Sequence, residues 1–443
     1  MSRGPSFVVK AGVRIMNFLL RNVVEHLVRQ GNLTIIDPEG AARVFGDGTG
    51  PKSTIAIRTR SAERAITLDL MLAVPEAYME GELDLLEGDV LDLLRIAFRN
   101  MGSNGIEASW TRAVEGVRVA FRRLQQVNTA VRSKRNVARH YDLSPELYRL
   151  FLDTDMQYSC AYFEHPDATL EEAQLAKKRH IAAKLDLRPG QTVLDIGCGF
   201  GGLGLYLARN FDVDVLGITL SEEQHAIATE RAHAEGLDRH VHFELRDYRD
   251  LKERFDRVVS VGMFEHVGVN HYRTYFDKVA RLLKPDGAML LHSIGRFGSP
   301  SATSAFIRKH IFPGGYIPAL SEVLPAIERA GLMTTDVEIL RLHYAETLRH
   351  WRARFLANRE TIRGIYDERF CRMWEFYLAG SEAAFRWQDL MVFQVQLTRA
   401  SSVLPMTRDY MLQTENAYRE RERAEPEYPK EAEGSRSMSD PGE

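Results

Sequence analysis

The sequence of 443 residues is poor in cysteine, with only Cys160, Cys198 and Cys371. No two of them stand at the spacing of a metal-binding pair, and no His-Glu-x-x-His motif is present. This scarcity excludes a disulfide framework and is typical of a protein of the reducing cytoplasm. We therefore expect a cytoplasmic protein without a metal site.

Long hydrophobic runs are also missing. Basic residues interrupt the apolar N-terminal stretch VVKAGVRIMNFLLRNVVEHLVRQG, so it lacks the continuous core of a signal peptide. No segment approaches the roughly 20 apolar residues needed to cross a bilayer. The charges nearly balance at a net −3, which argues against a protein dedicated to nucleic acids. We expect no membrane span and no nucleic-acid partner.

The composition is that of a globular protein, with 44% hydrophobic and 27% charged residues, and the length allows two or three domains. Residues 1–125 are predicted to form a small α/β domain. It begins with an amphipathic helix over residues 12–30, continues with the short β-like runs NLTIID and STIAIRT, and includes a turn-rich acidic patch at residues 78–94. The polar, charge-rich residues 411–443 are predicted to form a disordered tail.

Residues 117–139 combine an apolar stripe with many basic side chains. Val117, Phe121, Leu124 and Val131 lie near one helical face, and arginine and lysine cover much of the rest. A basic amphipathic helix of this kind can lie on an anionic membrane surface. A solvated linker helix has the same pattern, and the sequence leaves both interpretations open.

From residue 190 onward, strand-like and helix-like segments alternate. The strand-like runs are QTVLDIG, VDVLGIT, VHFELRD, DRVVSVG and GAMLLHSIG. This alternation predicts βαβ units and a parallel sheet covered on both faces. Just before it, Ser144-Pro145-Glu146 and Thr169-x-x-Glu172 predict two helix starts, with an irregular loop over residues 155–163 between them.

A glycine-rich turn follows the first of these strands, in VLDIGCGFGG. Enzymes that bind dinucleotides also place glycines there, but here the carboxylate of Asp195 precedes Gly197, Gly199 and Gly201. A pyrophosphate at the helix N-terminus would not favour that carboxylate. The order resembles motif I of class I S-adenosylmethionine (SAM) methyltransferases. The resemblance implies that the glycines admit the methionine part of SAM and that Asp195 orders its amino-acid end.

The second strand departs from that pattern. Many class I enzymes end it with an acidic residue for the ribose hydroxyls, whereas this sequence has Thr219, then Leu220 and, one turn on, Gln224. Thr219 and Gln224 can hydrogen-bond a hydroxyl without carrying charge. After the third strand, Asp247 and Tyr248 are candidates for contacts with adenine. The resemblance adds three more cofactor-binding candidates: Tyr158, Ser159 and Leu220.

Several motifs together carry a more specific resemblance. In order they are MQYSCAYF, VLDIGCGFGGL, GITLSEEQ, SVGMFEHVG, LLHSIG, IFPGGYIPALSE and HYAETLRHWRARF. Over about residues 135–405 the chain is similar to the cyclopropane-fatty-acyl-phospholipid synthase family, which includes mycolic-acid cyclopropane synthases.

The resemblance implies a class I SAM-dependent methyltransferase fold, doubly wound around a mostly parallel seven-stranded sheet. It assigns the catalytic domain to residues 126–410, with a helical lid, and lipid recognition or an accessory role to the smaller N-terminal domain at 1–125. It implies peripheral association with the inner face of the membrane through the phospholipid bilayer, and a homo-oligomer, with a dimer favoured.

The implied reaction is transfer of the SAM methyl group to a cis double bond of a phospholipid acyl chain, with bound bicarbonate as the base that closes a cyclopropane ring. The implied bicarbonate cage consists of Cys160 through its backbone N–H, Glu265, His292, Ile294 and Tyr344. Taken alone, Glu265 fits equally well as a carboxylate near a helix N-terminus, where the dipole favours it.

Two aromatic and aliphatic segments, residues 306–323 and 372–387, are predicted to form the lid and a hydrophobic acyl channel. Arg308 and Lys309 suit either a phosphate headgroup or a solvated lid surface. Relatives often carry a cysteine where this chain has Ser381, so an essential thiol nucleophile is not expected. The residues leave the product open, since a methylene or methyl branch can arise from the same cation. The alternative of a non-catalytic lipid-binding protein is disfavoured by the intact motifs.

Overall fold

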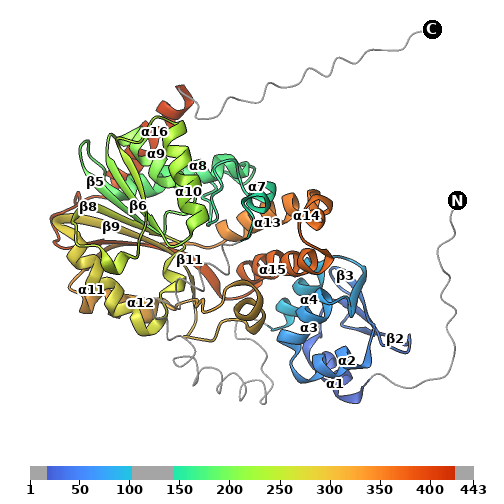
Figure 1. Cartoon of the computed structure of the whole chain (residues 1–443). Helices are drawn as coiled ribbons and strands as arrows, with labels where there is room; N and C mark the ends of the chain where they lie inside the picture. The colour runs from blue at the N-terminus through green and yellow to red at the C-terminus, as the bar shows by residue number, and fades with distance from the viewer. Residues whose placement is uncertain (1–16, 102–142, 425–443) are drawn as a thin grey trace, which may run out of the picture.

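The computed structural model describes residues 17–101 and 143–424, which contain two sheets (Figure 1). The N-terminal sheet has the order β2-β1-β3-β4. Its strands are β1 (Asn32–Ile36), β2 (Ala42–Phe45), β3 (Lys52–Ile57) and β4 (Leu83–Glu87), and its helices are α1 (Phe18–Leu27), α2 (Arg60–Leu68), α3 (Leu70–Met79) and α4 (Val90–Met101). This confirms a small α/β fold here, although the patch at 78–94 holds a strand and the start of a helix. The basic segment 117–139 lies outside the described residues.

The second sheet has seven strands in the order β10-β11-β9-β8-β5-β6-β7. Its strands are β5 (Thr192–Ile196), β6 (Asp214–Thr219), β7 (Val241–Leu245), β8 (Phe255–Val261), β9 (Leu283–Arg296), β10 (Met333–Leu340) and β11 (Leu390–Thr398). Strand β5 pairs in parallel with β6 and β8, and β9 continues the parallel set, whereas β11 is antiparallel to β9 and β10. The mostly parallel seven-stranded sheet expected from the sequence is confirmed.

Helices cover both faces of this sheet (Figure 1). On one side lie α8 (Leu170–Leu185), α9 (Gly202–Phe211) and α10 (Glu222–Ala234), and on the other α11 (Tyr272–Leu282) and α12 (Leu320–Arg329). The start of α8 is fixed by a complete capping box, because the Thr169 hydroxyl accepts from the Glu172 N–H at 3.2 Å and Glu172 accepts from the Thr169 N–H at 2.8 Å. Ser144 likewise caps α7 (Pro145–Phe151). Both predicted helix starts are confirmed.

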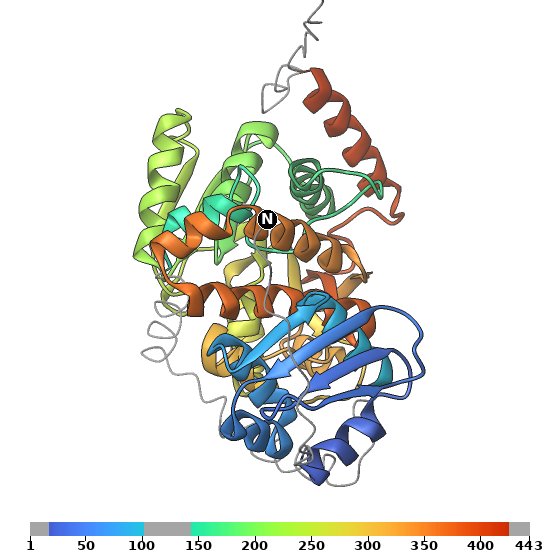
Figure 2. The ribbon, with the colours of Figure 1, turned by 90° about the vertical axis from the view of Figure 1, so that its right-hand side faces the viewer.

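A layer of three helices connects the two domains (Figure 2). It contains α13 (His343–Ala357), α14 (Arg359–Ile365) and α15 (Glu368–Trp387). Helix α15 packs against α3 and α4 of the N-terminal domain. The Tyr78 hydroxyl donates to Glu375 at 3.1 Å, and Arg372 pairs with Asp84 at 3.0 Å. The second of the two segments expected to form a lid, residues 372–387, is therefore part of a packed layer between the domains.

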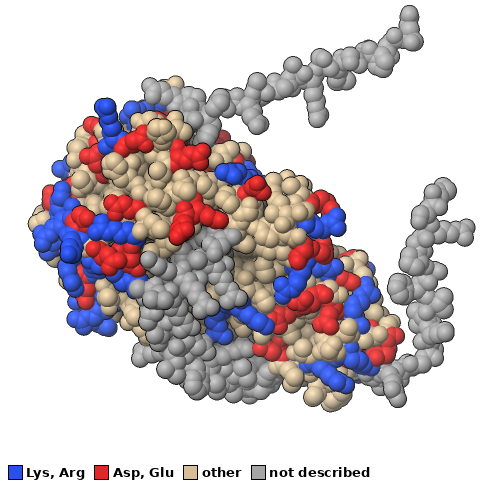
Figure 3. Space-filling model, in the orientation of Figure 1, with Lys and Arg blue, Asp and Glu red and all other residues tan. Residues whose placement is uncertain are grey.

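The surface carries no large region of a single charge on the face shown in Figure 3, where acidic and basic side chains are interspersed over both domains. This distribution agrees with the net charge of −3. Within residues 17–101 and 143–424, no helix is long and apolar enough to cross a membrane.

The expectation of a disordered tail from residue 411 is wrong for its first part. Residues Asp409–Ala424 form helix α16, which packs against α8. Its charged side chains meet charges that α8 buries: Glu415 contacts His180 and Glu422 contacts Arg179, and Arg419 pairs nearby with Glu164 at 2.5 Å. The polar composition that suggested disorder supplies these partners. The rest of the tail lies outside the described residues.

We expect protonated His180 to stabilise the fold in a pH-dependent way. Burial lowers the pKa of His180, but hydrogen bonds to Glu338 (2.7 Å) and Glu415 raise it more, so the net pKa is raised. Because the pKa of His180 is higher in the folded state, its protonation stabilises the fold. This stabilisation is complete below the unfolded-state pKa of about 6.5 and is lost as pH rises through the folded-state pKa. His180→Gln should lower the unfolding midpoint by roughly 2–4 °C near pH 6, and less at higher pH.

The control is His233→Gln, because His233 forms a comparable pair with Asp238 on the surface with 85% of its side chain exposed. That variant should show little effect at either pH. A deficit for His180→Gln that stays constant from acid to alkaline pH would contradict the role of the charge.

Candidate active site

Two cavities meet at the carboxyl ends of the parallel strands, where ligands bind in open α/β sheets. The smaller has a volume of about 160 Å³ and lies over the glycine-rich turn after β5. The larger has a volume of about 1660 Å³ and extends into the N-terminal domain. Tyr158, Ser159, Gly262 and His266 line both cavities. A ligand in the smaller cavity can therefore reach one in the larger.

The smaller cavity brings together nearly all the residues predicted to bind the cofactor. It is lined by Tyr158, Ser159, Asp195, Gly197, Gly199, Thr219, Leu220, Gln224, Asp247 and Tyr248. Gly201 is not in the lining. An added Cβ there would lie 2.7 Å from the Phe243 ring and 2.9 Å from Ala228. Gly201 therefore serves the turn into α9 and its packing, since its φ of 84° also favours glycine.

The chemistry of the smaller cavity fits the methionine part of SAM. Asp195 is buried, and its Oδ2 has no hydrogen-bond partner among the described residues. Burial raises the pKa of Asp195 to about 7, although the nearby Lys177 charge lowers it. An amino group would supply the missing partner and favour the ionised carboxylate. An added Cβ on Gly199 would have no atom within 4 Å, so the backbone there faces open space.

The contacts at the other end are more mixed. The Thr219 hydroxyl donates to Gln224 Oε1 at 3.0 Å, so these two predicted residues act as a pair. Asp247 lines the cavity, but its carboxylate accepts from Arg249 Nε at 2.9 Å and from the Arg249 backbone N–H at 3.0 Å. The Arg249 guanidinium also lies 5.6 Å from the Tyr248 ring centroid. Asp247 therefore orders the Arg249 and Tyr248 segment as well as lining the cavity.

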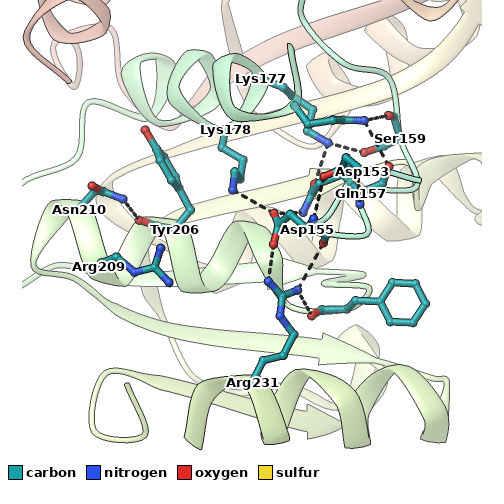
Figure 4. A network of polar contacts seen from close by, with 12 residues as sticks. Asp153, Asp155, Gln157, Ser159, Lys177, Lys178, Tyr206, Arg209, Asn210 and Arg231 are labelled. Carbon is teal, nitrogen blue, oxygen red and sulfur yellow. Dashed lines mark hydrogen bonds and ion pairs between the residues drawn. The ribbon is translucent and has the colours of Figure 1, made fainter. Parts of the chain in front are cut away.

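A buried ion-pair network holds the loop that carries Tyr158 and Ser159 (Figure 4). Asp155 pairs with Lys178 at 3.0 Å and with Arg231. Lys177, which is 1% exposed, donates to Gln157 at 2.7 Å and to the Ser159 hydroxyl at 2.8 Å. Burial lowers the pKa of Lys177, and the neighbouring carboxylates oppose that effect.

Lys177 also lines the cofactor cavity, yet sequence reasoning missed it. Charged residues in a helix normally face solvent. Here α8 is buried on nearly every side, including Lys177, Lys178 and Lys184. No periodic signal in the sequence distinguishes such a helix from a surface helix.

The larger cavity brings together all five predicted catalytic residues: Cys160, Glu265, His292, Ile294 and Tyr344. The Ile294 N–H donates to Glu265 Oε1 at 2.7 Å, while Oε2 has no hydrogen-bond partner among the described residues. Burial raises the pKa of Glu265 to about 7, although the Ile294 N–H lowers it. Burial therefore favours the protonated form of Glu265 more than water does.

His292 is a neutral hydrogen-bond donor in this site. Burial, together with the positive charges of Lys177, Lys184 and His180, lowers the pKa of His292 to about 3. Gln394 Nε2 lies 3.2 Å from His292 Nδ1. With Gln394 donating to Nδ1, the imidazole proton is on Nε2.

The cysteines are unsuited to nucleophilic catalysis. The Cys160 thiol contacts the Ala161 carbonyl at 3.3 Å, and burial raises its pKa well above the usual range. Cys371 is fully buried and burial raises its pKa as well. Ser381, not a cysteine, lines the larger cavity. These findings agree with the expectation that no thiol is essential.

The walls of the larger cavity are mostly apolar. The two segments expected to form them contribute Phe306, Phe312, Tyr316, Phe376, Tyr377 and Phe385. The N-terminal domain also forms part of the wall, which the sequence did not predict. Its apolar contributions include Leu20, Val24, Ile55, Ile57, Leu83 and Leu94. The volume exceeds the roughly 300–1,000 Å³ of ordinary small-molecule sites. It therefore suits a long hydrocarbon ligand.

The charges expected near the lid have another role. Lys309 pairs with Glu76 of α3 at 2.6 Å, and 58% of its side chain is exposed. Neither Lys309 nor Arg308 lines the cavity. Lys309 therefore links the surfaces of the two domains.

Comparisons with known proteins agree with this geometry. A family model described as mycolic acid cyclopropane synthetase matches residues 128–395, and a model of a domain of unknown function matches residues 20–107. Cyclopropane-fatty-acyl-phospholipid synthase of Escherichia coli strain K12 is 40% identical over 355 residues, covering 80% of this chain and 89% of that protein. Tuberculostearic acid methyltransferase UfaA1 of Mycobacterium tuberculosis is 35% identical over 411 residues, covering 90% of this chain and 93% of that protein.

Among solved structures, the crystal structure of mycolic acid cyclopropane synthase CmaA1 complexed with SAH and CTAB has a TM-score of 0.57 and 37% identity. The match covers 60% of this chain and 97% of the CmaA1 chain. The fold and the cofactor cavity define a SAM-dependent methyltransferase. The chain belongs to the mycolic acid cyclopropane synthetase family, together with these cyclopropane synthases and lipid methyltransferases.

We expect Gly199→Val to abolish SAM binding, because the side chain would occupy the open space over the glycine turn. Isothermal calorimetry with SAM measures this directly. Gly190→Val is the matched control, since Gly190 also has a positive φ (77° against 55°) and open space but does not line the cavity. Unchanged SAM affinity in folded Gly199→Val would show that the cofactor binds elsewhere.

Proposed function

We propose that this protein transfers a methyl group from SAM to a cis double bond in the acyl chain of a membrane phospholipid and closes a cyclopropane ring, with bound bicarbonate as the base. The observation that carries the proposal is the junction of the two cavities at Tyr158, Ser159, Gly262 and His266. The printed name of the Escherichia coli relative, cyclopropane-fatty-acyl-phospholipid synthase, supports the substrate class.

When bound, SAM supplies a methyl group on a positively charged sulfur. The residues of this chain hold and align the reactants, which matters because an alkene is a weak nucleophile. Asp195 holds the amino end of the cofactor, and Lys177 fixes Ser159 at the junction through its 2.8 Å hydrogen bond. The apolar walls exclude water that would trap a cation on the acyl chain. Each buried methylene of the lipid contributes about 0.8 kcal/mol to binding.

The proposed base site rests on Glu265, His292 and Tyr344. A bicarbonate ion beside an ionised glutamate would be repelled in a buried site. Glu265, with its pKa raised by burial to about 7, can instead share a proton with the anion, so the two titrate as one unit. The Ile294 N–H holds the other carboxylate oxygen, and the His292 imidazole donates through Nε2. Cys160 contributes its backbone N–H.

A second product is favoured by a particular relative. UfaA1 is named a tuberculostearic acid methyltransferase and aligns with 90% of this chain. The same cation on the acyl chain can shift a hydride and lose a proton from the new methyl group, which gives a methylene. A methyl branch then requires a separate reductase that adds a hydride and a proton to the methylene. Mass spectrometry and proton NMR of lipids from an expressing host test the two proposals, since a ring, an exomethylene and a methyl branch give different signals.

We expect Glu265→Gln to retain SAM binding but to lower turnover at least roughly a hundredfold, because it removes proton sharing with the bound anion while preserving size. Turnover is measured with SAM and an unsaturated phospholipid, and SAM affinity by calorimetry. Added bicarbonate should restore part of the activity, since mass action offsets weaker anion binding.

His292→Gln should behave in the same way, whereas Cys160→Ala should be milder because only the backbone of that residue is used. Wild-type turnover of Glu265→Gln in bicarbonate-depleted buffer would rule out the proposed base site.

We also infer that the protein docks peripherally on anionic membranes through the basic segment 117–139, which lies outside the described residues. Each basic side chain near such a surface contributes about 1 kcal/mol. Replacing Arg122, Arg123, Lys134 and Arg135 by glutamine should strongly weaken co-sedimentation with anionic vesicles, and salt should weaken the wild type likewise. Equal co-sedimentation of the variant and the wild type would contradict membrane docking through this segment and support its interpretation as a solvated linker.

A further inference from the structure

Strand β9 extends the catalytic face of the larger cavity beyond the reacting groups. His292, Ile294 and Arg296 alternate along the strand and all line the cavity. Alternate residues of a strand lie on one face, and four residues span roughly 13 Å. Arg296 is therefore attached on the same face as His292, at the end of β9 and two residues beyond Ile294, whose N–H donates to Glu265.

Arg296 is held firmly but its side chain is poorly satisfied. Its backbone N–H donates to the Pro318 carbonyl at 3.0 Å, and the residue pairs with Leu390 across the sheet. The side chain is 10% exposed, and Nε has no hydrogen-bond partner among the described residues. Asp389 forms an ion pair with Arg296, but its carboxylate lies 3.7 Å from NH1, beyond hydrogen-bond distance. A buried guanidinium with unused donors is costly unless a ligand supplies acceptors.

Two further arginines line the same cavity from the N-terminal domain. Arg99, near the end of α4, lies 5.9 Å from the Trp387 ring centroid. Gln388 donates to the Phe98 carbonyl at 3.1 Å, which places the end of α4 beside the segment that carries Asp389. Arg29, just after α1, is joined to α4 because its N–H donates to Asn100 at 3.0 Å.

The fixed charges of this rim favour an anion. Neither Arg29 nor Arg99 forms an ion pair within the described part of the chain, and both are exposed. Apart from Glu265, the fixed charges lining the cavity are Arg29, Arg99 and Arg296 with the carboxylates Asp69 and Asp389. The cations outnumber these carboxylates, and Arg296 is the least exposed of the three cations.

We propose that Arg296, assisted by Arg99 and Arg29, binds the phosphate of the phospholipid whose acyl chain occupies the larger cavity. A guanidinium matches the geometry of phosphate through paired hydrogen bonds. The apolar walls of the larger cavity then receive the acyl chain, so the bound phosphate sets which double bond reaches the junction. This inference rests on the proposed function and adds the residues that recognise the headgroup.

The test compares three lipids in mixed detergent micelles: a dioleoyl phospholipid, dioleoylglycerol and free oleate. The micelles separate headgroup recognition from docking on a bilayer. Arg296→Gln should lower kcat/KM for the phospholipid roughly tenfold to a hundredfold, the effect expected for lost charged hydrogen bonds. The value for dioleoylglycerol and the affinity for SAM should remain unchanged.

Three further variants test the roles of Arg99 and Asp389. Arg95→Gln is matched to Arg99→Gln, because Arg95 lies 5.8 Å from the same Trp387 ring but does not line the cavity. Of these two variants, Arg99→Gln should reduce the preference for phospholipid over dioleoylglycerol, whereas Arg95→Gln should leave it unchanged. Asp389→Asn should increase that preference, since it removes a carboxylate that competes with the phosphate for Arg296.

The outcomes separate this inference from the proposed function. Equal losses with phospholipid and dioleoylglycerol in Arg296→Gln would overturn the site and indicate a structural role. An equal loss with free oleate would overturn the assignment to phosphate, since any lipid anion would then suffice. If the wild type modifies none of the lipids, the proposed function fails. In that case, binding of a radiolabelled short-chain phospholipid tests the phosphate site independently of turnover. Equal binding by the wild type and Arg296→Gln would overturn the phosphate site.

Discussion

The buried carboxylate of Asp155 holds in place an irregular segment that lines both cavities. Its ion pairs with Lys178 and Arg231 tie the loop before α8 to α8 and α10. The fit is close, because a Cβ added to Gly202 would lie 2.3 Å from Asp155 Oδ2. A buried carboxylate is tolerated only with such partners. The second glycine of the Gly-Gly pair therefore serves this anchor, whereas Gly199 faces the cofactor cavity.

The anchored loop separates two environments that the reaction needs side by side. Towards the cofactor, Asp195 and Lys177 provide buried charge. Towards the lipid, burial raises the pKa of Glu265 and lowers the pKa of His292, so both groups favour their neutral forms. Neutral polar groups allow a hydrocarbon chain to lie beside them at a lower cost than charges would. Burial thus makes the larger cavity compatible with its proposed ligand.

The N-terminal domain completes the lipid cavity instead of only being attached to the catalytic domain. Helix α15 contacts both α3 and α4, and apolar residues of the first domain form part of the cavity wall. The solved mycolic acid cyclopropane synthase covers only 60% of this chain, whereas the relatives UfaA1 and the Escherichia coli synthase cover 90% and 80%. The alignments with these two relatives therefore extend beyond the part of the chain that the solved structure covers.

The sequence alone determined the features that depend on local patterns. The alternation of strands and helices predicted the parallel sheet, the capping box fixed the start of α8, and the order of Asp195 and the glycines indicated SAM. Ordered motifs also identified five candidate catalytic residues, all of which line the larger cavity. These features are readable because a strand end, a cap or a turn depends on residues close together in the chain.

The tertiary structure decided which charges are buried and which distant segments share a cavity. The sequence did not single out Lys177 or Arg296, and it suggested a disordered tail where α16 lies. Each has its role through partners far away in sequence, such as Ser159 for Lys177, Asp389 for Arg296 and His180 for Glu415 of α16. Spacing within a segment carries no information about such contacts, because only the packing of separate elements brings the partners together.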